Sequence, residues 1–267
     1  MQITQAKKRP SLVFTIIIYL CLASLSLLDS SAQQRSRFLK WSYQDAGGLL
    51  ESIAPKVPLF AIAGGATLFT GIRIDEPFQD DVKKSYTSNS VWGHYLDITN
   101  EIGGTKVRLP VAGIFIATLF TKNTKLQDAA FTSLQSWLYS GILSYGLKHS
   151  FGRFRPEDGF GAGKFEPFSA NSSFPSGHTT AAFALITPWV LYYPHPITYG
   201  LFALSTGTAI ARMAQDKHWP TDVIAGAALG FFTGRYLTRR HLTKVVNPGL
   251  DISSSAMPNG FVISVKW

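Results

Sequence analysis

The sequence contains a single cysteine and few charged residues. Cys21 lies in an apolar N-terminal segment that we expect to be removed, so the exported chain would carry no thiol. This excludes disulfide bonds and cysteine catalysis. Charged residues make up 15% of the chain, whereas about a quarter is usual in soluble proteins. Because hydrophobic residues make up 46%, the chain has ample material for a core and does not resemble a disordered protein.

Motifs for nucleic-acid binding are missing as well. The formal net charge is +9, but the basic residues are scattered, and no zinc-finger or RNP-type motif is present. We therefore predict no nucleic-acid partner. An anionic substrate or an anionic membrane surface explains the positive charge better.

The N-terminus has the pattern of an export signal. Basic residues at positions 7–9 precede an apolar run over 12–28, and small residues follow at 30–32. This order is typical of a secretory signal peptide. We predict that residues 1–32 are such a signal, with an uncleaved N-terminal anchor as the alternative. The protein is then expected in the cell envelope, either periplasmic or membrane-associated.

Helical patterns dominate the rest of the chain. Residues 126–147 have helical apolar spacing, which would place Lys148 at the end of a helix. Residues 179–211 contain no Lys, Arg, Asp or Glu, and prolines at 188, 194 and 196 divide them into a predicted helical hairpin. A last helix is expected to start near Pro220. Its glycines at 226, 230 and 234 would let another helix approach closely.

Shorter segments complete the predicted organisation. We expect a short helix at 43–53, an exposed acidic loop at 75–81, a turn at 100–104, a loop at 157–173 and strand-like alternation at 261–267. The predicted fold class is all-α, a bundle of about six core helices over residues 33–246, followed by a tail at 247–267. Most apolar runs are shorter than the roughly 20 residues that cross a bilayer. A buried soluble core and a membrane-associated or partly membrane-embedded bundle both remain open.

Positive charges gather in two segments. Lys148, Arg153 and Arg155 lie within eight positions, and Arg212 ends the uncharged run. A phosphate dianion is bound best by donors from several directions, and arginine can supply a planar two-pronged contact. A solvated basic loop would also explain the first segment. Arg212 requires either snorkelling or a buried anionic partner.

A Pro-Ser-Gly turn precedes the uncharged run. If a helix starts there, the backbone N–H groups of Ser176 and Gly177 can bind an anion. Plain N-capping by Ser176 is the alternative. No Gly-x-Ser-x-Gly elbow surrounds this serine, which disfavours a nucleophilic role.

Two histidines and one aspartate complete the candidate chemistry. His218 and Asp222 are four residues apart, so the carboxylate can orient the imidazole for attack on phosphorus, which gives a phosphohistidine. His178 can act as the general acid. The alternatives are a surface position for His218 and a satisfied core histidine for His178. We assign the other histidines to the core class: His94, His149, His195 and His241. A metal site is less favoured, since zinc ligands usually have tighter spacings and the cations would repel a divalent ion.

The three segments together resemble a known family. Lys148-(six residues)-Arg155-Pro156, Pro175-Ser176-Gly177-His178 and Arg212-(five residues)-His218-(three residues)-Asp222 are similar to the motifs of the type 2 phosphatidic acid phosphatase superfamily. This superfamily includes class A acid phosphatases, glucose-6-phosphatase and vanadium haloperoxidases. The resemblance covers about residues 145–225. It implies a helical bundle and metal-independent hydrolysis of phosphate monoesters or lipid pyrophosphates.

The resemblance also implies a role for each matching residue. It makes His218 the nucleophile, Asp222 its orienting carboxylate and His178 the acid that protonates the leaving group. The phosphate-binding positions would be Lys148, Arg155, Ser176, Gly177 and Arg212. The chain departs from the family at Ala211, where a serine is usual. Arg153 lies outside the motif and receives no role.

We therefore expect a phosphatase of the cell envelope that acts on a lipid-linked phosphate or pyrophosphate, without metal or cofactor. Its partners would be the phosphorylated lipid, or a small phosphate ester, and a membrane surface. No obligate protein partner is implied. The alternatives are a soluble non-specific acid phosphatase, a vanadium haloperoxidase and a non-catalytic lipid-binding membrane protein.

Overall fold

The computed structural model describes residues 32–53, 57–88, 90–246, 251–257 and 260–266. Nearly all of the predicted signal peptide lies outside these ranges. The chain forms two compact units, residues 1–47 and 48–267. The described part of the first unit belongs to α2 (Ala32–Ile53). The helix predicted at 43–53 is confirmed and begins eleven residues earlier than expected.

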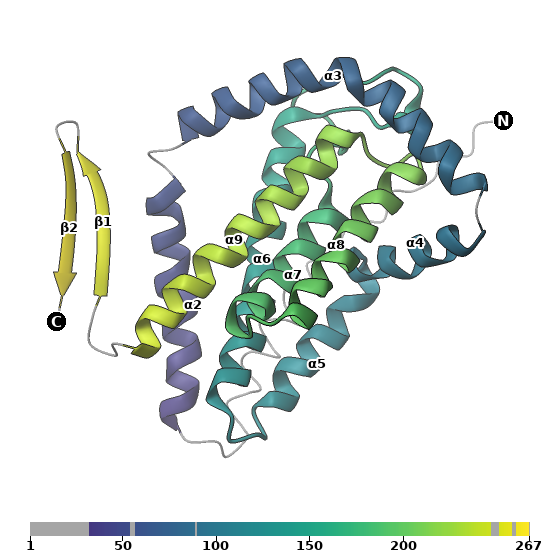
Figure 1. Ribbon diagram of the computed structural model, residues 1–267. Helices are drawn as coiled ribbons and strands as arrows, with labels where there is room; N and C mark the ends of the chain where they lie inside the picture. The colour runs from purple at the N-terminus through teal and green to yellow at the C-terminus, as the bar shows by residue number, and fades with distance from the viewer. Residues whose placement is uncertain (1–31, 54–56, 89, 247–250, 258–259, 267) are drawn as a thin grey trace. The chain divides into compact units, whose positions relative to one another are not determined.

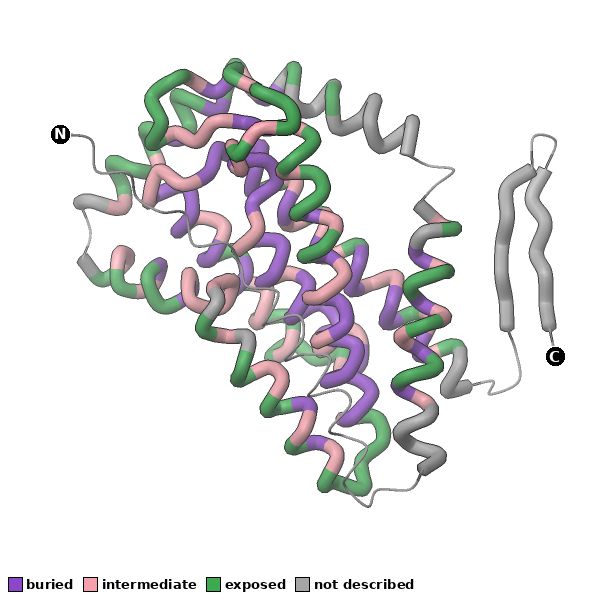
Figure 2. Tube along the Cα trace, turned by 180° about the vertical axis from the view of Figure 1, so that it is seen from behind, coloured by how far each residue is buried: buried purple, intermediate pink, exposed green. Residues whose placement is uncertain are grey.

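The second unit is a helical bundle, which confirms the predicted fold class (Figure 1). Its α-helices are α3 (Val57–Ser88), α4 (Ser90–Gly103), α5 (Arg108–Thr118), α6 (Thr124–Phe151), α7 (Gly177–Tyr192), α8 (Pro196–Ala214) and α9 (Pro220–Val246). Two short 3-10 turns, η3 (Thr105–Val107) and η4 (Pro156–Asp158), lie in the connections. α7 packs against α4, α6, α8 and α9, and buried residues run through the middle of the bundle (Figure 2).

The tail forms a β-hairpin. Strand β1 (Asp251–Met257) pairs with β2 (Gly260–Lys266) in antiparallel register, with Ser254 opposite Ile263. The strand predicted near the C-terminus is therefore confirmed, and a partner strand precedes it.

The charge-free run forms the predicted hairpin of α7 and α8. The break between these helices lies at residues 193–195, whereas Pro188 lies inside α7. α9 begins at Pro220, as its position in a first helical turn predicts.

The prediction of an exposed loop at 75–81 was wrong, because α3 continues through Pro77. Proline removes one backbone hydrogen bond from a helix. Side chains on either side of it are instead held by the rest of the bundle. Asp75 is fully buried, and Gln79 donates to Asp216 Oδ1 at 3.1 Å. These tertiary contacts keep α3 helical despite the proline at position 77.

Small residues let α7 and α9 approach each other closely, as predicted. A Cβ atom added at Gly226 would lie 2.6 Å from the Ser176 carbonyl oxygen, and one at Gly230 would lie 2.3 Å from that of Thr180. Real Cβ atoms essentially never approach another atom within 3.0 Å, so both distances are too short. Only glycine therefore permits this packing, which sets the start of α9 against the start of α7.

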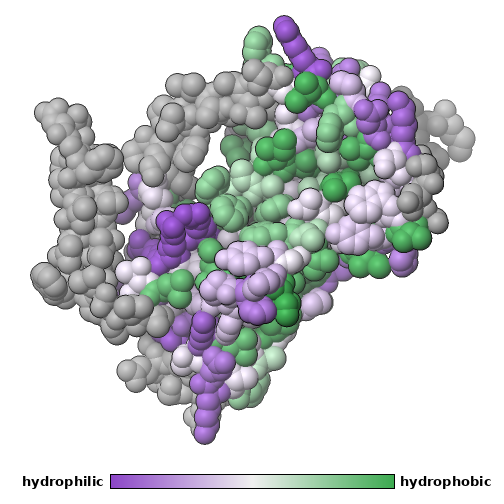
Figure 3. Space-filling view, in the orientation of Figure 1, coloured by the Kyte–Doolittle hydropathy of each residue, from purple (hydrophilic) through white to green (hydrophobic). Residues whose placement is uncertain are grey.

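No helix in the described ranges has both the length and the apolar content needed to cross a bilayer. Large apolar side chains are exposed on α8 and α9, and Figure 3 shows hydrophobic residues interspersed with polar ones on this face. Those with more than half of their surface exposed are Ile197, Tyr199, Ile224 and Phe232.

Candidate active site

The first motif begins in the last turn of α6, where the sequence places Lys148. The helix ends at Phe151, and the next residue, Gly152, adopts a left-handed conformation (φ 56°) and donates its N–H to the Lys148 carbonyl at 2.9 Å. The Lys148 ammonium turns back toward the loop before α7 and donates to the carbonyl of Ser172. The helix end and the loop thus fix the position of this cation.

Direct contacts bring the three motifs together. Ser176 donates its backbone N–H to the Asp222 carbonyl at 2.9 Å. A Cβ at Gly177 would lie 3.4 Å from Lys148 Cε. The Ser176 N–H is therefore already used within the protein, which corrects the prediction that it is free for an anion. Ser176 occupies the N-cap position, but its side chain makes no capping bond and instead accepts from Thr179 Oγ1 at 2.9 Å.

His218 and Asp222 face each other in the interior. Their side chains are 2% and 0% exposed, and Nδ1 of the imidazole lies 3.7 Å from Asp222 Oδ2. This distance is too long for a hydrogen bond, and Nδ1 is buried without another partner among the described residues. Oδ2 instead accepts from Ser173 Oγ at 2.5 Å and from the Trp219 N–H at 2.9 Å. The carboxylate is thus held in place beside the imidazole.

Burial sets the protonation of this pair. Desolvation lowers the pKa of His218 to about 3, against the attraction of Asp222. Burial by itself would raise the pKa of Asp222, but His218 and the charge of Arg153 bring it below its usual value. Near neutral pH the free protein therefore holds a neutral imidazole beside an ionised carboxylate, which is the state that a nucleophilic imidazole requires.

Arg212 is a buried cation whose charge is not neutralised by a direct partner. It is 8% exposed, and its Nη1 has contacts of 3.4 Å with the side-chain oxygens of Asn100 and Gln215. Its Nε has no hydrogen-bond partner among the described residues. Burial and the charge of Arg155 lower its pKa to about 10. Within the described ranges neither snorkelling nor a paired carboxylate accounts for Arg212, so an anion would satisfy it.

Arg155 is half-buried and lies beside the same loop. Its Nη2 donates to Ser172 Oγ at 3.3 Å, and its Nη1 lies 3.4 Å from Glu157 Oε1. Its charge lowers the pKa values of both Lys148 and Arg212, so the three cations interact electrostatically.

Lys148 provides a pH-dependent prediction. Burial and the charge of Arg155, with a further contribution from Arg212, lower its pKa to about 7. The amine is then mostly neutral at about pH 8, and a bound phosphate dianion would restore its proton. Binding of inorganic phosphate at that pH should take up about one proton. Isothermal titration calorimetry in buffers of different ionisation enthalpy measures this uptake, and the Lys148→Met variant should show none. Equal uptake by both proteins would contradict this assignment.

His178 lies in the first turn of α7 and is half-buried. The end of α4 fixes its backbone, because a Cβ at Gly103 would lie 2.2 Å from the His178 carbonyl oxygen. His178 follows Ser176, whose amide is bonded to Asp222, so the second motif is anchored at the third. His241, which we predicted to be a core histidine, is buried, and its Nδ1 lies 2.7 Å from Thr132 Oγ1. The same prediction was wrong for His94, His149 and His195, which are exposed.

Two residues that support the site, Ser173 and Asp75, were not predicted from the sequence. Ser173 bonds to Asp222, although it lies in a segment that predicts only a loop. Asp75 reaches Arg153 and Thr221 from α3, but its acidic, proline-containing surroundings indicate an exposed segment. Neither position carries a local pattern that could have revealed it. Among the residues that the structure describes, no group of three or more His, Cys, Asp or Glu side chains is placed to hold a metal ion.

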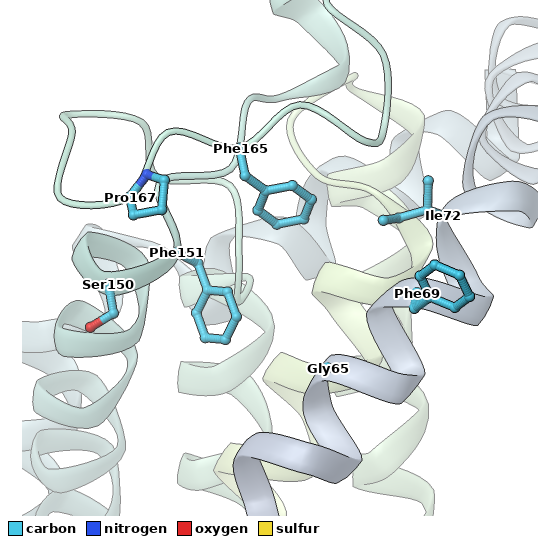
Figure 4. Close-up of a pocket in the computed structure, with 7 residues that line it drawn as sticks. All are labelled: Gly65, Phe69, Ile72, Ser150, Phe151, Phe165 and Pro167. Carbon is cyan, nitrogen blue, oxygen red and sulfur yellow. The ribbon is translucent and has the colours of Figure 1, made fainter.

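An apolar cavity of about 450 Å³ lies beside the first motif (Figure 4). It is lined by Gly65, Phe69 and Ile72 of α3, Ser150 and Phe151 at the end of α6, and Phe165 and Pro167 of the following loop. The Phe151 ring packs edge-to-face on the ring of Phe174, with 4.9 Å between centroids. The Phe151 ring thus connects the wall of this cavity to the residue that precedes the Pro-Ser-Gly turn.

Known proteins share parts of this chain. A lipid A 1-phosphatase of Porphyromonas gingivalis is 39% identical over 101 residues, which are 36% of this chain and 20% of that protein. A lipid A 1-phosphatase of Rhizobium johnstonii is 37% identical over 98 residues, which are 35% of this chain and 40% of that protein. The matched segment thus spans less than half the length of these curated relatives.

A solved structure has a similar fold. The first transmembrane PAP2 type phosphatidylglycerolphosphate phosphatase from Bacillus subtilis superposes with a TM-score of 0.52 and 17% identity, over 73% of this chain and 97% of that one. The model of the PAP2 superfamily matches residues 129–245. This segment contains the helices that bring Lys148, Ser176 and Asp222 together, and over it the chain matches the superfamily that the three motifs predicted.

Proposed function

We propose that the protein is a phosphatase that hydrolyses the phosphate monoester or pyrophosphate of a lipid-linked substrate through a phosphohistidine intermediate. The observation that carries this proposal is the arrangement at His218. A neutral, buried imidazole faces a fixed carboxylate, and cations from separate segments lie around it. A protein that only bound an anion would not require the pair of His218 and Asp222.

Three cations would bind the phosphoryl group. Lys148 and Arg155 approach from the end of α6 and its loop, and Arg212 comes from the end of α8. The unpartnered Nε of Arg212 would donate to a phosphate oxygen, as would the amide of Gly177. Phosphoryl transfer requires neutralisation of the charge on the equatorial oxygens, and guanidinium and ammonium groups can supply it without a metal ion.

Two chemical steps follow from this arrangement. Asp222 would hold the proton on His218 Nδ1, which leaves the Nε2 lone pair to attack phosphorus. The bond to the leaving oxygen breaks, and His178 gives that oxygen a proton. In the second step His178 would take a proton from water as the water attacks the phosphohistidine. Inorganic phosphate leaves, and His218 returns to its neutral form.

A lipid-linked substrate is favoured over a small ester by three observations. The relatives named above are lipid A 1-phosphatases. The apolar cavity beside the first motif would suit an acyl chain. Apolar side chains exposed on α8 and α9 would suit contact with a membrane surface. We therefore place the reaction at a membrane of the cell envelope.

The test is release of inorganic phosphate from lipid and soluble phosphate esters in the presence of EDTA. We expect hydrolysis that persists in the chelator, with lipid phosphates or pyrophosphates turned over at least about tenfold more efficiently than soluble esters in kcat/KM. Loss of turnover in EDTA, restored by a divalent metal, would contradict the metal-free mechanism. Turnover of soluble esters alone would contradict the lipid substrate class.

A further inference from the structure

Arg153 is a fully buried arginine that binds two carboxylates. Its Nη1 donates to Asp222 Oδ1 at 2.7 Å, and its Nη2 donates to Asp75 Oδ2 at 2.6 Å. All three side chains are 0% exposed. A buried charge is tolerated when it is paired and hydrogen-bonded. These three residues therefore form one interior unit that joins α3, the loop after α6 and the start of α9.

Arg153 cannot reach a substrate, because its remaining donors point into the protein. Nε and Nη2 donate to the Ala162 carbonyl at 3.0 and 2.7 Å, and Nη1 also donates to Thr221 Oγ1 at 2.7 Å. The rings of Phe165 and Trp219 lie 5.3 and 5.7 Å from its Cζ. This enclosure separates Arg153 from the phosphate-binding cations. Among its partners, Asp222 is the one that faces His218, so it is the route by which Arg153 would affect the reaction.

Asp75 is held as firmly as Arg153. Its Oδ1 accepts the Thr221 N–H at 2.9 Å, and its Oδ2 accepts Thr221 Oγ1 at 2.6 Å as well as Arg153 Nη2. Thr221 lies in the first turn of α9, so the carboxylate also satisfies an N–H at the start of that helix. Asp75 therefore has little freedom to turn away from Arg153.

The two oxygens of Asp222 have separate tasks. Oδ1 is bound by Arg153, whereas Oδ2 is the oxygen that faces His218 Nδ1. The bond from Arg153 fixes the rotation of the carboxylate about its Cβ–Cγ bond. Without it, Oδ2 would depend on Ser173 and the Trp219 N–H alone.

The charges explain why a second carboxylate is present. If Asp222 were the sole partner of Arg153, the cation would offset most of the negative charge that the imidazole experiences. Asp75 neutralises Arg153 from the opposite side, so the three groups carry a net charge of −1. Because Coulomb interactions are strong in a medium of low dielectric constant, this charge would attract the positive charge that His218 develops during phosphoryl transfer.

We propose that Asp75, acting through Arg153, is a positioning residue that fixes the orientation and preserves the negative charge of Asp222, and thereby holds the proton of His218 on Nδ1. This inference rests on the proposed role of His218 as the nucleophile. It extends the site by one carboxylate from α3.

The test replaces Asp75 with asparagine, which keeps its size but not its charge. We expect kcat to fall by about 10- to 100-fold, the range typical for residues that orient a reacting group, while KM changes less than about threefold. Glu76→Gln is the matched control. Glu76 lies next to Asp75 on α3 and accepts the Ala162 N–H at 2.8 Å, so it supports the same loop without touching Arg153 or Asp222. Its kcat should stay within about twofold of the unmodified protein.

A second readout requires no turnover. ¹⁵N NMR of histidine-labelled protein reports which ring nitrogen carries the proton. In the unmodified protein the His218 signals should be those of the Nδ1–H tautomer, and in Asp75→Asn they should move toward the Nε2–H tautomer. If Asp75→Asn does not fold, Arg153→Lys serves instead. Lysine keeps the charge but cannot bridge both carboxylates, so the same tautomer change and loss of kcat are expected.

The outcomes separate this inference from the proposed function. Unchanged kcat and His218 signals in Asp75→Asn, with only a lower melting temperature, would reduce Asp75 to a structural residue and overturn the inference. Absence of hydrolysis by the unmodified protein would overturn the proposed function, while the NMR experiment would still test the link from Asp75 to His218.

Discussion

Replacing His218 with alanine is expected to abolish phosphate release, with a loss in kcat of at least about a thousandfold. The reason is chemical, since His218 supplies the imidazole that faces Asp222 Oδ2, and alanine has no nucleophilic group to replace it. His149→Ala is the matched control. His149 follows Lys148 directly but is exposed, and its removal should leave kcat within about twofold.

The intermediate can be tested in the same proteins. Rapid quenching of the unmodified enzyme with substrate labelled in the phosphate should trap protein-bound label that is stable to base and labile to acid, as expected of a phosphohistidine. The His218→Ala variant should trap none and should keep its helical circular dichroism. Full turnover or full labelling in that variant would refute the nucleophilic role of His218.

Replacing Gly230 with alanine is expected to destabilise the protein by about 2 to 3 kcal/mol. In most helices this change is favourable by about 1 kcal/mol. Here the new Cβ would lie 2.3 Å from the Thr180 carbonyl oxygen, so α7 and α9 would have to move apart. Since these helices carry His178 and Asp222, kcat should fall as well.

Gly146→Ala provides the comparison. Gly146 is a helical glycine of α6, and a Cβ there would meet nothing within 4 Å. Its replacement should be neutral or stabilising. Thermal or denaturant unfolding of both variants measures the difference, and equal stability of the two proteins would show that α7 and α9 are less tightly packed than the structure indicates.

The helices of the site were predictable because each had a local pattern. The apolar spacing over 126–147 placed Lys148 in the last turn of α6. The glycines of the last helix predicted close packing, although the sequence does not say which helix packs there. In each case one segment contains all the information that the prediction used.

The ion pair between Asp75 of α3 and Arg153 could not be predicted, because the two residues lie far apart in the sequence. Asp75 is followed closely by Pro77 and further acidic residues, and local rules read such a segment as exposed. Its burial depends on Arg153, 78 residues away. A buried ion pair becomes apparent only when both partners are placed, and neither local sequence indicates the other.

α3 precedes the segment that matches the family, and this affects how relatives of this chain should be compared. The family match covers residues 129–245, whereas Asp75 and Gln79 contact the loop and helix start around His218 from well before that segment. A fragment cut at the limits of the match would keep every motif residue but lose Asp75, one of the two carboxylates that bind Arg153. Two proteins with identical motifs can therefore differ in activity through an upstream helix that motif alignment never examines.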